Sequence, residues 1–168
     1  YFGEFTMDGN NVPLESSSMY YLNNQLKFQG TITKFDRNFN PTAFEGTVEW
    51  FHSNGRLALQ AEYDSDHSVK HYYPLSLVEW DEDGRATKNA VFDRQGRTLT
   101  STTNEYAYDG GLVRQVQLER MGATYTEKVI DCSFGTCWSV HSDALLDTED
   151  AAARSIEWIG EESWTRTN

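Results

Sequence analysis

The side chains best suited to metal chemistry include two histidines four residues apart, His67 and His71, with Asp64 and Asp66 just upstream. His52 lies elsewhere in the chain and could supply a further nitrogen. Imidazole and carboxylate groups are ordinary zinc ligands, so a transition-metal site can be drawn from these residues. This stretch has the pattern of a turn followed by a strand, however, in which residues i and i+4 lie about 13 Å apart. We therefore expect exposed histidines, and predict no metal site and no cofactor.

A run of three acids, Asp81, Glu82 and Asp83, precedes Gly84 and invites comparison with a calcium-binding loop. Such a loop needs a bidentate glutamate at its twelfth position, and counting from Asp81 that position is Phe92. Carboxylates beside a glycine are also common in tight turns, where Asp accepts hydrogen bonds from nearby backbone amides. The run therefore predicts a hairpin turn with exposed acids.

Sequence signatures of common catalytic sites are missing. The chain has no Gly-x-Ser-x-Gly nucleophile elbow, and Ser139 and His141 are neighbours only along the sequence. It has no phosphate-binding loop and no dinucleotide fingerprint. With 26 Asp and Glu residues, no single carboxylate pair stands out as a glycosidase pair. We predict no catalytic residues; the alternative is a hydrolase that places His52 or His71 beside a carboxylate.

The chain has two cysteines, Cys132 and Cys137, separated by four residues that include Gly135. A compact hairpin tip of this length can bring two cysteines within bonding distance. The redox motif C-x-x-C is absent, so we predict a structural disulfide. A structural disulfide favours an oxidising compartment, either the periplasm or the outside of the cell.

Aromatic residues are abundant, with five Trp, nine Tyr and nine Phe. Several are adjacent in sequence, as in Trp50-Phe51 and Tyr72-Tyr73, and adjacent residues of a strand face opposite sides of the sheet. One ring of each pair is therefore either covered on a second face or exposed to a protein partner or a stacked sugar. The candidate partner-binding residues combine the turn acids with nearby rings: Asp81, Glu82, Asp83, Trp50, Trp80 and Tyr73.

The elements that must position these residues are indicated by a recurring unit. Seven times between residues 21 and 108, an aromatic residue precedes a short polar segment, often closed by glycine and arginine. Alternate units lie 28 to 30 residues apart, and Gly55, Gly84 and Gly96 supply the positive φ of a tight reversal. This spacing is typical of tandem β-hairpins. The units begin at Tyr21, Phe35, Phe51, Tyr63, Trp80, Phe92 and Tyr108.

The segments between these turns alternate as half-buried strands should. Leu57, Leu59, Ala61 and Tyr63 share one face, with Ala58, Gln60 and Glu62 on the other. Residues 112–120 alternate in a similar way. Such alternation is typical of antiparallel sheets that expose one face to solvent.

The unit of an aromatic residue, Asp, two residues, Gly and Arg is clearest at residues 80–85 and 92–97. It resembles the YD and MORN-type hairpin repeats of bacterial secreted and envelope proteins, over about half of the chain. The resemblance implies a β scaffold that in some contexts binds a partner, and it implies no catalytic residues. The chain differs from those repeats in its longer spacing and in the missing glycine after Phe35 and Tyr63.

We expect one all-β domain over residues 1–168, an antiparallel meander of repeated hairpins that forms a curled sheet, a barrel or a hairpin stack. Residues 1–18 are a polar leading segment with a strand at 1–7, and residues 19–120 hold the hairpin repeats. Residues 121–168 hold a closing hairpin, one short helix and a last strand. The helix is expected over residues 142–154, where Thr148 can cap a run of alanines, and the strand over 156–166.

The charge and hydropathy of the chain limit the classes of partner that we expect. The chain has 14 Lys and Arg against 26 Asp and Glu, a net charge of −12 that disfavours nucleic acid. The acidic surface either serves solvation alone or complements a basic protein partner. No apolar run reaches the ~18 residues of a membrane helix. The first residue is Tyr1, which fits a mature chain after signal-peptide removal or a shortened chain.

We therefore predict a non-enzymatic, secreted or periplasmic protein-binding module, such as an immunity or inhibitor protein or an envelope-assembly subunit. The alternative is a carbohydrate- or lipid-binding β-barrel that uses an aromatic surface.

Overall fold

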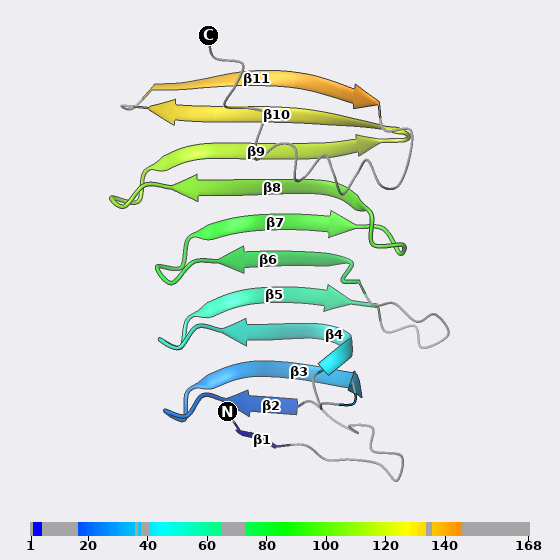
Figure 1. The fold of residues 1–168 in the computed structure, drawn as a ribbon, viewed down its shortest axis with the longest axis vertical. Helices are drawn as coiled ribbons and strands as arrows, with labels where there is room; N and C mark the ends of the chain where they lie inside the picture. The colour runs from blue at the N-terminus through cyan, green and yellow to red at the C-terminus, as the bar shows by residue number, and fades with distance from the viewer. Residues whose placement is uncertain are drawn as a thin grey trace.

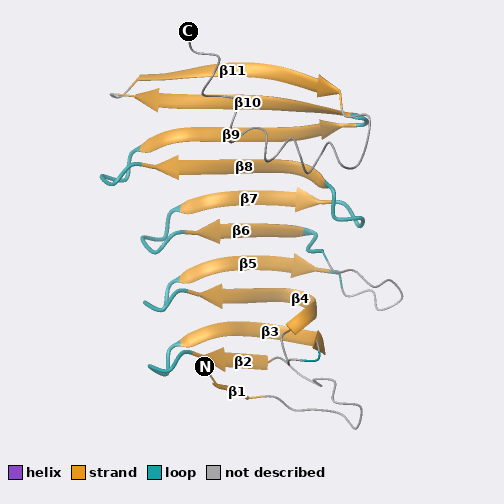
Figure 2. Cartoon of the chain, viewed as in Figure 1, coloured by secondary structure: helices purple, strands orange, loops and turns teal. Residues whose placement is uncertain are grey.

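A computed structural model describes residues 2–4, 17–35, 37, 41–64, 73–133 and 136–145. These residues form one antiparallel sheet of eleven strands that lie side by side in chain order (Figure 1). The described residues contain strands and loops and no helix (Figure 2). The strands are β1 (Phe2–Glu4), β2 (Ser17–Tyr20), β3 (Leu26–Phe35), β4 (Pro41–Phe51), β5 (Leu57–Tyr63), β6 (Ser76–Trp80), β7 (Ala86–Phe92), β8 (Thr98–Tyr106), β9 (Leu112–Met121), β10 (Thr124–Ser133) and β11 (Thr136–Leu145).

The meander is open. Strands β1 and β11 lie at opposite ends of the stack, and among the described strands each has one neighbour, β2 and β10 respectively (Figure 1). The predicted antiparallel meander of hairpins is confirmed, and the barrel alternative is wrong. Successive connections lie at alternate ends of the strands, which explains why every second unit of the sequence pattern shares the 28 to 30 residue spacing.

Five turns share one hydrogen-bonding pattern. In each, the first residue's N–H donates to the fifth residue's carbonyl, and the fourth residue's N–H donates to the first residue's carbonyl. The fourth residue has a positive φ, which favours glycine and is tolerated by asparagine. It is Asn24, Gly55, Gly84, Gly96 and Gly110 in the turns at residues 21–25, 52–56, 81–85, 93–97 and 107–111.

Each of these turns follows an aromatic residue at which the strand register shifts by one. The prediction is correct for Phe51, Trp80 and Phe92. It is wrong for Tyr21 and Tyr108, which lie inside their turns; the residues that precede those turns are Tyr20 and Tyr106. Both turns have a second tyrosine within two residues, so the residue type alone could not set the register.

The apolar core lies on one face of the N-terminal strands. Phe28, Ile32 and Val48 are at most 1% exposed, and the ring of Phe28 lies 5.1 Å from that of Trp50. Leu59 and Tyr63 pack against this cluster, in the alternation that the sequence predicts for β5. Aromatic rings at edge-to-face distances add to the stabilisation that comes from buried area.

The ends of the chain differ in part from expectation. Residues 142–145, the start of the expected helix, belong to β11 and pair with β10, so that part of the helix prediction is wrong. A cap such as Thr148 is a local signal, whereas β10 offers ten backbone partners to this segment. The rest of the expected helix and the strand at 156–166 lie outside the described residues. In the leading segment, Ser17 and Ser18 belong to β2.

Candidate functional site

Four turns lie next to one another at one end of the sheet, and we name them the turn row: residues 21–25, 52–56, 81–85 and 107–111. Side chains link consecutive turns. The Tyr21 hydroxyl donates to the Phe51 carbonyl at 2.8 Å, and His52 Nε2 lies 2.9 Å from the Trp80 carbonyl. Because a carbonyl only accepts, a hydrogen bond here requires Nε2 of His52 to be the donor. These bonds join neighbouring hairpins at the strand ends.

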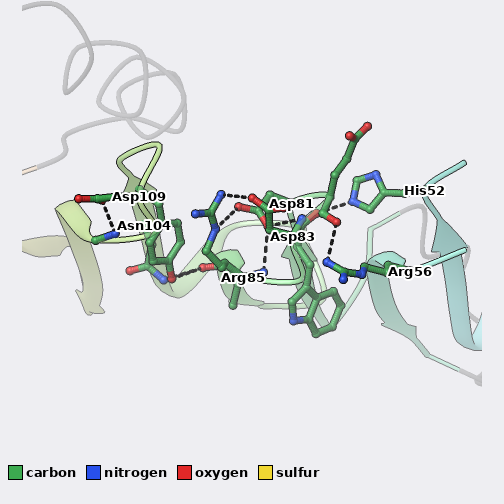
Figure 3. Close-up of polar contacts among 12 residues, drawn as sticks. His52, Arg56, Asp81, Asp83, Arg85, Asn104 and Asp109 are labelled. Carbon is green, nitrogen blue, oxygen red and sulfur yellow. Dashed lines mark hydrogen bonds and ion pairs between the residues drawn. The ribbon is translucent and has the colours of Figure 1, made fainter. Parts of the chain in front are cut away.

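The predicted acidic residues lie in the third turn of this row (Figure 3). Asp81 Oδ1 accepts from the backbone N–H groups of Asp83 and Arg85, at 3.0 and 2.9 Å. Arg85 donates from Nε to Asp81 and from Nη2 to Asp83, both at 2.7 Å. Burial raises the pKa of Asp81, but hydrogen bonds from Arg85 and Asp83 lower it by more, so the pKa lies below its ordinary value. Both carboxylates therefore serve the turn itself.

The neighbouring turn brings a second cation to these acids. The Glu82 carbonyl accepts from Asn54 Nδ2 and from Arg56 Nη1, both at 3.0 Å. Glu82 is exposed. The turns at residues 52–56 and 81–85 together hold three carboxylates and two guanidinium groups, those of Arg56 and Arg85, so their local surplus is one negative charge. A surplus this small gives weak steering of a basic partner.

The structure does not bring the predicted partner-binding residues together on one surface. Trp50 packs in the core against Phe28, and Trp80 is half-buried with its carbonyl bonded to His52. Tyr73 is 56% exposed and lies beside Gly96. Gly96 belongs to the turn between β7 and β8, which is at the other end of the strands from the turn row (Figure 1). The six residues therefore do not form one surface.

The histidine hypothesis is tested only in part. His67, His71 and Asp66 lie outside the described residues, while Asp64 pairs with Arg94 at 3.2 Å. Within the described residues, no group of three or more His, Cys, Asp or Glu side chains is placed to hold a metal ion. In the same residues, no helix is long and apolar enough to cross a membrane.

The predicted disulfide is confirmed. Cys132 and Cys137 are bonded and are directly opposite each other in the β10–β11 ladder. Strand β11 pairs with β10 through all ten of its residues, and with no other strand among those described. Its residues 136–141 are exposed. The disulfide thus fixes one end of a long edge strand.

Apolar side chains gather on one face at this edge. Val116, Val129 and Val140 are directly opposite one another on β9, β10 and β11, and Val140 is 59% exposed. Trp138, 51% exposed, lies two residues before Val140 and shares its face. We name these four residues the edge patch. Beside it, Arg114 lies 3.6 Å from Asp131, the residue opposite Trp138.

The sequence analysis missed the edge patch. Trp138 and Val140 alternate with Cys137, Ser139 and His141, which is a strand pattern that extends past the disulfide. Because a helix was expected from residue 142, the strand was not predicted to continue to Leu145. That alternation was the available signal.

Comparisons with known proteins give no family. No protein-family model matches the chain, and no curated protein matches it. Among solved structures, one match is a chain of the GtfA/B complex bound to UDP and GlcNAc, at 12% identity and a TM-score of 0.24. That match covers 95% of this chain and 27% of the other, so this chain spans about a quarter of its length. A TM-score this low carries no argument about function.

Proposed function

We propose that this chain is a non-enzymatic, secreted or periplasmic protein-binding module, and that an extended segment of its partner adds as a strand to β11. The observation that carries the proposal is the ten-residue strand β11, which among the described strands pairs with β10 alone and is exposed over residues 136–141, Trp138 and Val140 included. Strand addition obtains affinity from backbone hydrogen bonds and specificity from alternate side chains.

The two edges of the sheet differ in a way that favours β11. Strand β1 has three residues, whereas β11 has ten and pairs with β10 without a register shift. Natural edge strands are commonly protected by short length, by bulges, or by lysine and proline. Strand β11 has no bulge, lysine or proline, and Asp143 is its one Asp, Glu, Lys or Arg residue. It is therefore the better template for a partner strand.

The edge patch supplies side-chain contacts for such a strand. An apolar residue placed opposite Val140 would continue the valine row of β9, β10 and β11 by one strand. Full burial of a side chain of this kind contributes roughly 1.5–3 kcal/mol. Trp138 is the type of residue that dominates binding energy at protein interfaces, and the Arg114–Asp131 pair forms a polar border. The expected partner segment is extended, with alternating apolar residues.

The disulfide supports both parts of the proposal. It holds β11 against β10, so less order must be created when the partner binds. Structural disulfides persist in oxidising compartments, which supports a secreted or periplasmic location. An immunity protein, an inhibitor and an envelope-assembly subunit are concrete forms of the proposed module.

The test compares two exposed valines. Tagged wild type, Val140→Lys and Val113→Lys are used under oxidising conditions to capture proteins from extract of the native host, with quantification by mass spectrometry. Val113 is 41% exposed but lies on the interior strand β9. We expect a stoichiometric partner that Val140→Lys loses and Val113→Lys retains. Equal capture by both variants, or no stoichiometric partner, would contradict strand addition at β11.

A further inference from the structure

The face opposite the edge patch carries a second candidate site. Thr102, Gln117, Lys128 and His141 are in register across β8, β9, β10 and β11. Each lies one residue from the row that contains Val116, Val129 and Val140, so the two rows are on opposite faces of the sheet. A second row, Thr100, Glu119 and Thr126, lies two residues further along the strands. The two rows line a shallow groove of about 430 Å³.

The charged groups of this groove are unpaired. Within the part of the chain that the structure describes, neither Lys128 nor Glu119 has a hydrogen-bond or ion-pair partner. Other basic residues of the sheet have ion-pair partners. Lys88 Nζ, for example, lies 3.8 Å from Glu79 Oε1. The side chains of Arg85, Arg97, Arg114 and Arg120 likewise contact carboxylates. Lys128 thus has no direct ion-pair partner, and the other charged group that lines the groove is Glu119.

A chain of amides fixes the hydrogen-bonding character of the groove wall. Gln117 Nε2 donates to Gln115 at 2.6 Å, Gln115 Nε2 to Asn104 at 2.8 Å, and Asn104 Nδ2 to the Ala86 carbonyl at 2.9 Å. Since the last group is a carbonyl, every amide must donate toward it. Gln117 Oε1 therefore remains an acceptor for a ligand in the groove.

From these groups we propose that the groove binds an acidic oligosaccharide, a function separate from partner binding at β11. A ligand carboxylate contacts Lys128 Nζ, because a charge-assisted bond to an unpaired ammonium is the strongest contact available. Ligand hydroxyls bond to the threonine hydroxyls, Gln117 Oε1 and Glu119. The rows span four strands about 4.8 Å apart, which suits an elongated ligand lying across them. An extended peptide is less suitable because the side chains of the two rows are polar and form no apolar pocket.

The test is an NMR titration of the ¹⁵N-labelled chain with trigalacturonate, maltotriose and triglutamate. Trigalacturonate should shift amides of β8–β11 around the groove and bind tightest of the three. Lys128→Gln should weaken this binding roughly tenfold or more, which is the loss of one charge-assisted contact. Lys88→Gln, on the opposite face, should bind as wild type does. Thr126→Val, which keeps the side-chain shape and removes one hydroxyl, should bind several-fold more weakly.

Three results would overturn the proposal. The first is an absence of groove shifts at millimolar trigalacturonate. The second is unchanged binding in Lys128→Gln. The third is equal binding of triglutamate or maltotriose, which would exclude saccharide specificity or the carboxylate contact respectively. None of these results bears on capture at β11, so the two proposals fail separately.

Discussion

Asp81 and Asp93 occupy the first position of two turns and make the same bonds. Each accepts from two backbone N–H groups of its own turn and from the Nε of an arginine four residues later, at 2.7 Å in one turn and 2.6 Å in the other. In the three turns without this aspartate, the third residue accepts the fifth residue's N–H instead, and it is Asn23, Asn54 or Asp109. The sequence could identify these acids, and the Asp-to-Arg spacing was the signal that each charge is compensated within its turn.

Asp93 gives a pH-dependent prediction at this scale. Burial raises the pKa of Asp93, and hydrogen bonds from Arg97 and Gln95 lower it by more, so the pKa lies below the ordinary 3.8. Its stabilising effect is therefore complete above the ordinary pKa and is lost as the pH falls through the folded-state pKa. Asp93→Asn should lower the free energy of unfolding by about 0.5–1 kcal/mol at pH 7. In urea unfolding at a series of pH values, this difference should vanish in strong acid.

Asp109→Asn is the matched control. Asp109 accepts one backbone N–H from Gly111, a bond that Asn54 makes to Arg56 with an amide oxygen. The substitution should leave stability nearly unchanged across the same pH range. A constant Asp93→Asn difference from neutral to acid pH would contradict the assigned ion-pair role.

At the scale of elements, the hairpin is the unit that the sequence predicts best. Turn positions at Gly55, Gly84 and Gly96 were predictable because positive φ excludes most other residues. The turn position at Asn24 was harder to predict, since asparagine tolerates a positive φ but occurs more often at negative φ. The strand β11 could not be delimited because its pairing with β10, and not local propensity, decides its length.

Two turn glycines separate backbone strain from packing. A Cβ added at Gly84 has no atom within 4 Å, whereas one at Gly96 would lie 2.5 Å from Tyr73 Cγ, and both glycines have φ near +80°. Gly84→Ala should cost about 1–2 kcal/mol of folding stability through its left-handed backbone. Gly96→Ala should cost more, because the Tyr73 ring must also move.

A double-mutant cycle in chemical unfolding measures that difference. In a Tyr73→Ala background, the cost of Gly96→Ala should fall to that of Gly84→Ala. If the cost stays the same with and without the ring, the contact between Tyr73 and Gly96 does not contribute.

At the scale of the whole molecule, the sequence predicts a meander but does not decide its closure. Hairpin turns are local, whereas closure requires β1 to pair with β11 across the full chain, and no turn motif encodes that pairing.

The charge of the molecule is unevenly distributed along the chain. The described residues hold 11 Lys and Arg and 16 Asp and Glu, so their net charge is 11 − 16 = −5 of the total −12. The remaining −7 lies outside the described residues, which reduces the case for a basic partner on the sheet.

The most direct test of the account is amide hydrogen exchange of the chain with and without the partner that wild type captures and Val140→Lys loses. Strand addition predicts slower exchange on binding within residues 136–145, at the amides of β11 that do not bond to β10. Slower exchange confined to the turn row, with β11 unchanged, would contradict the proposal and return the partner site to Asp81, Glu82 and Asp83.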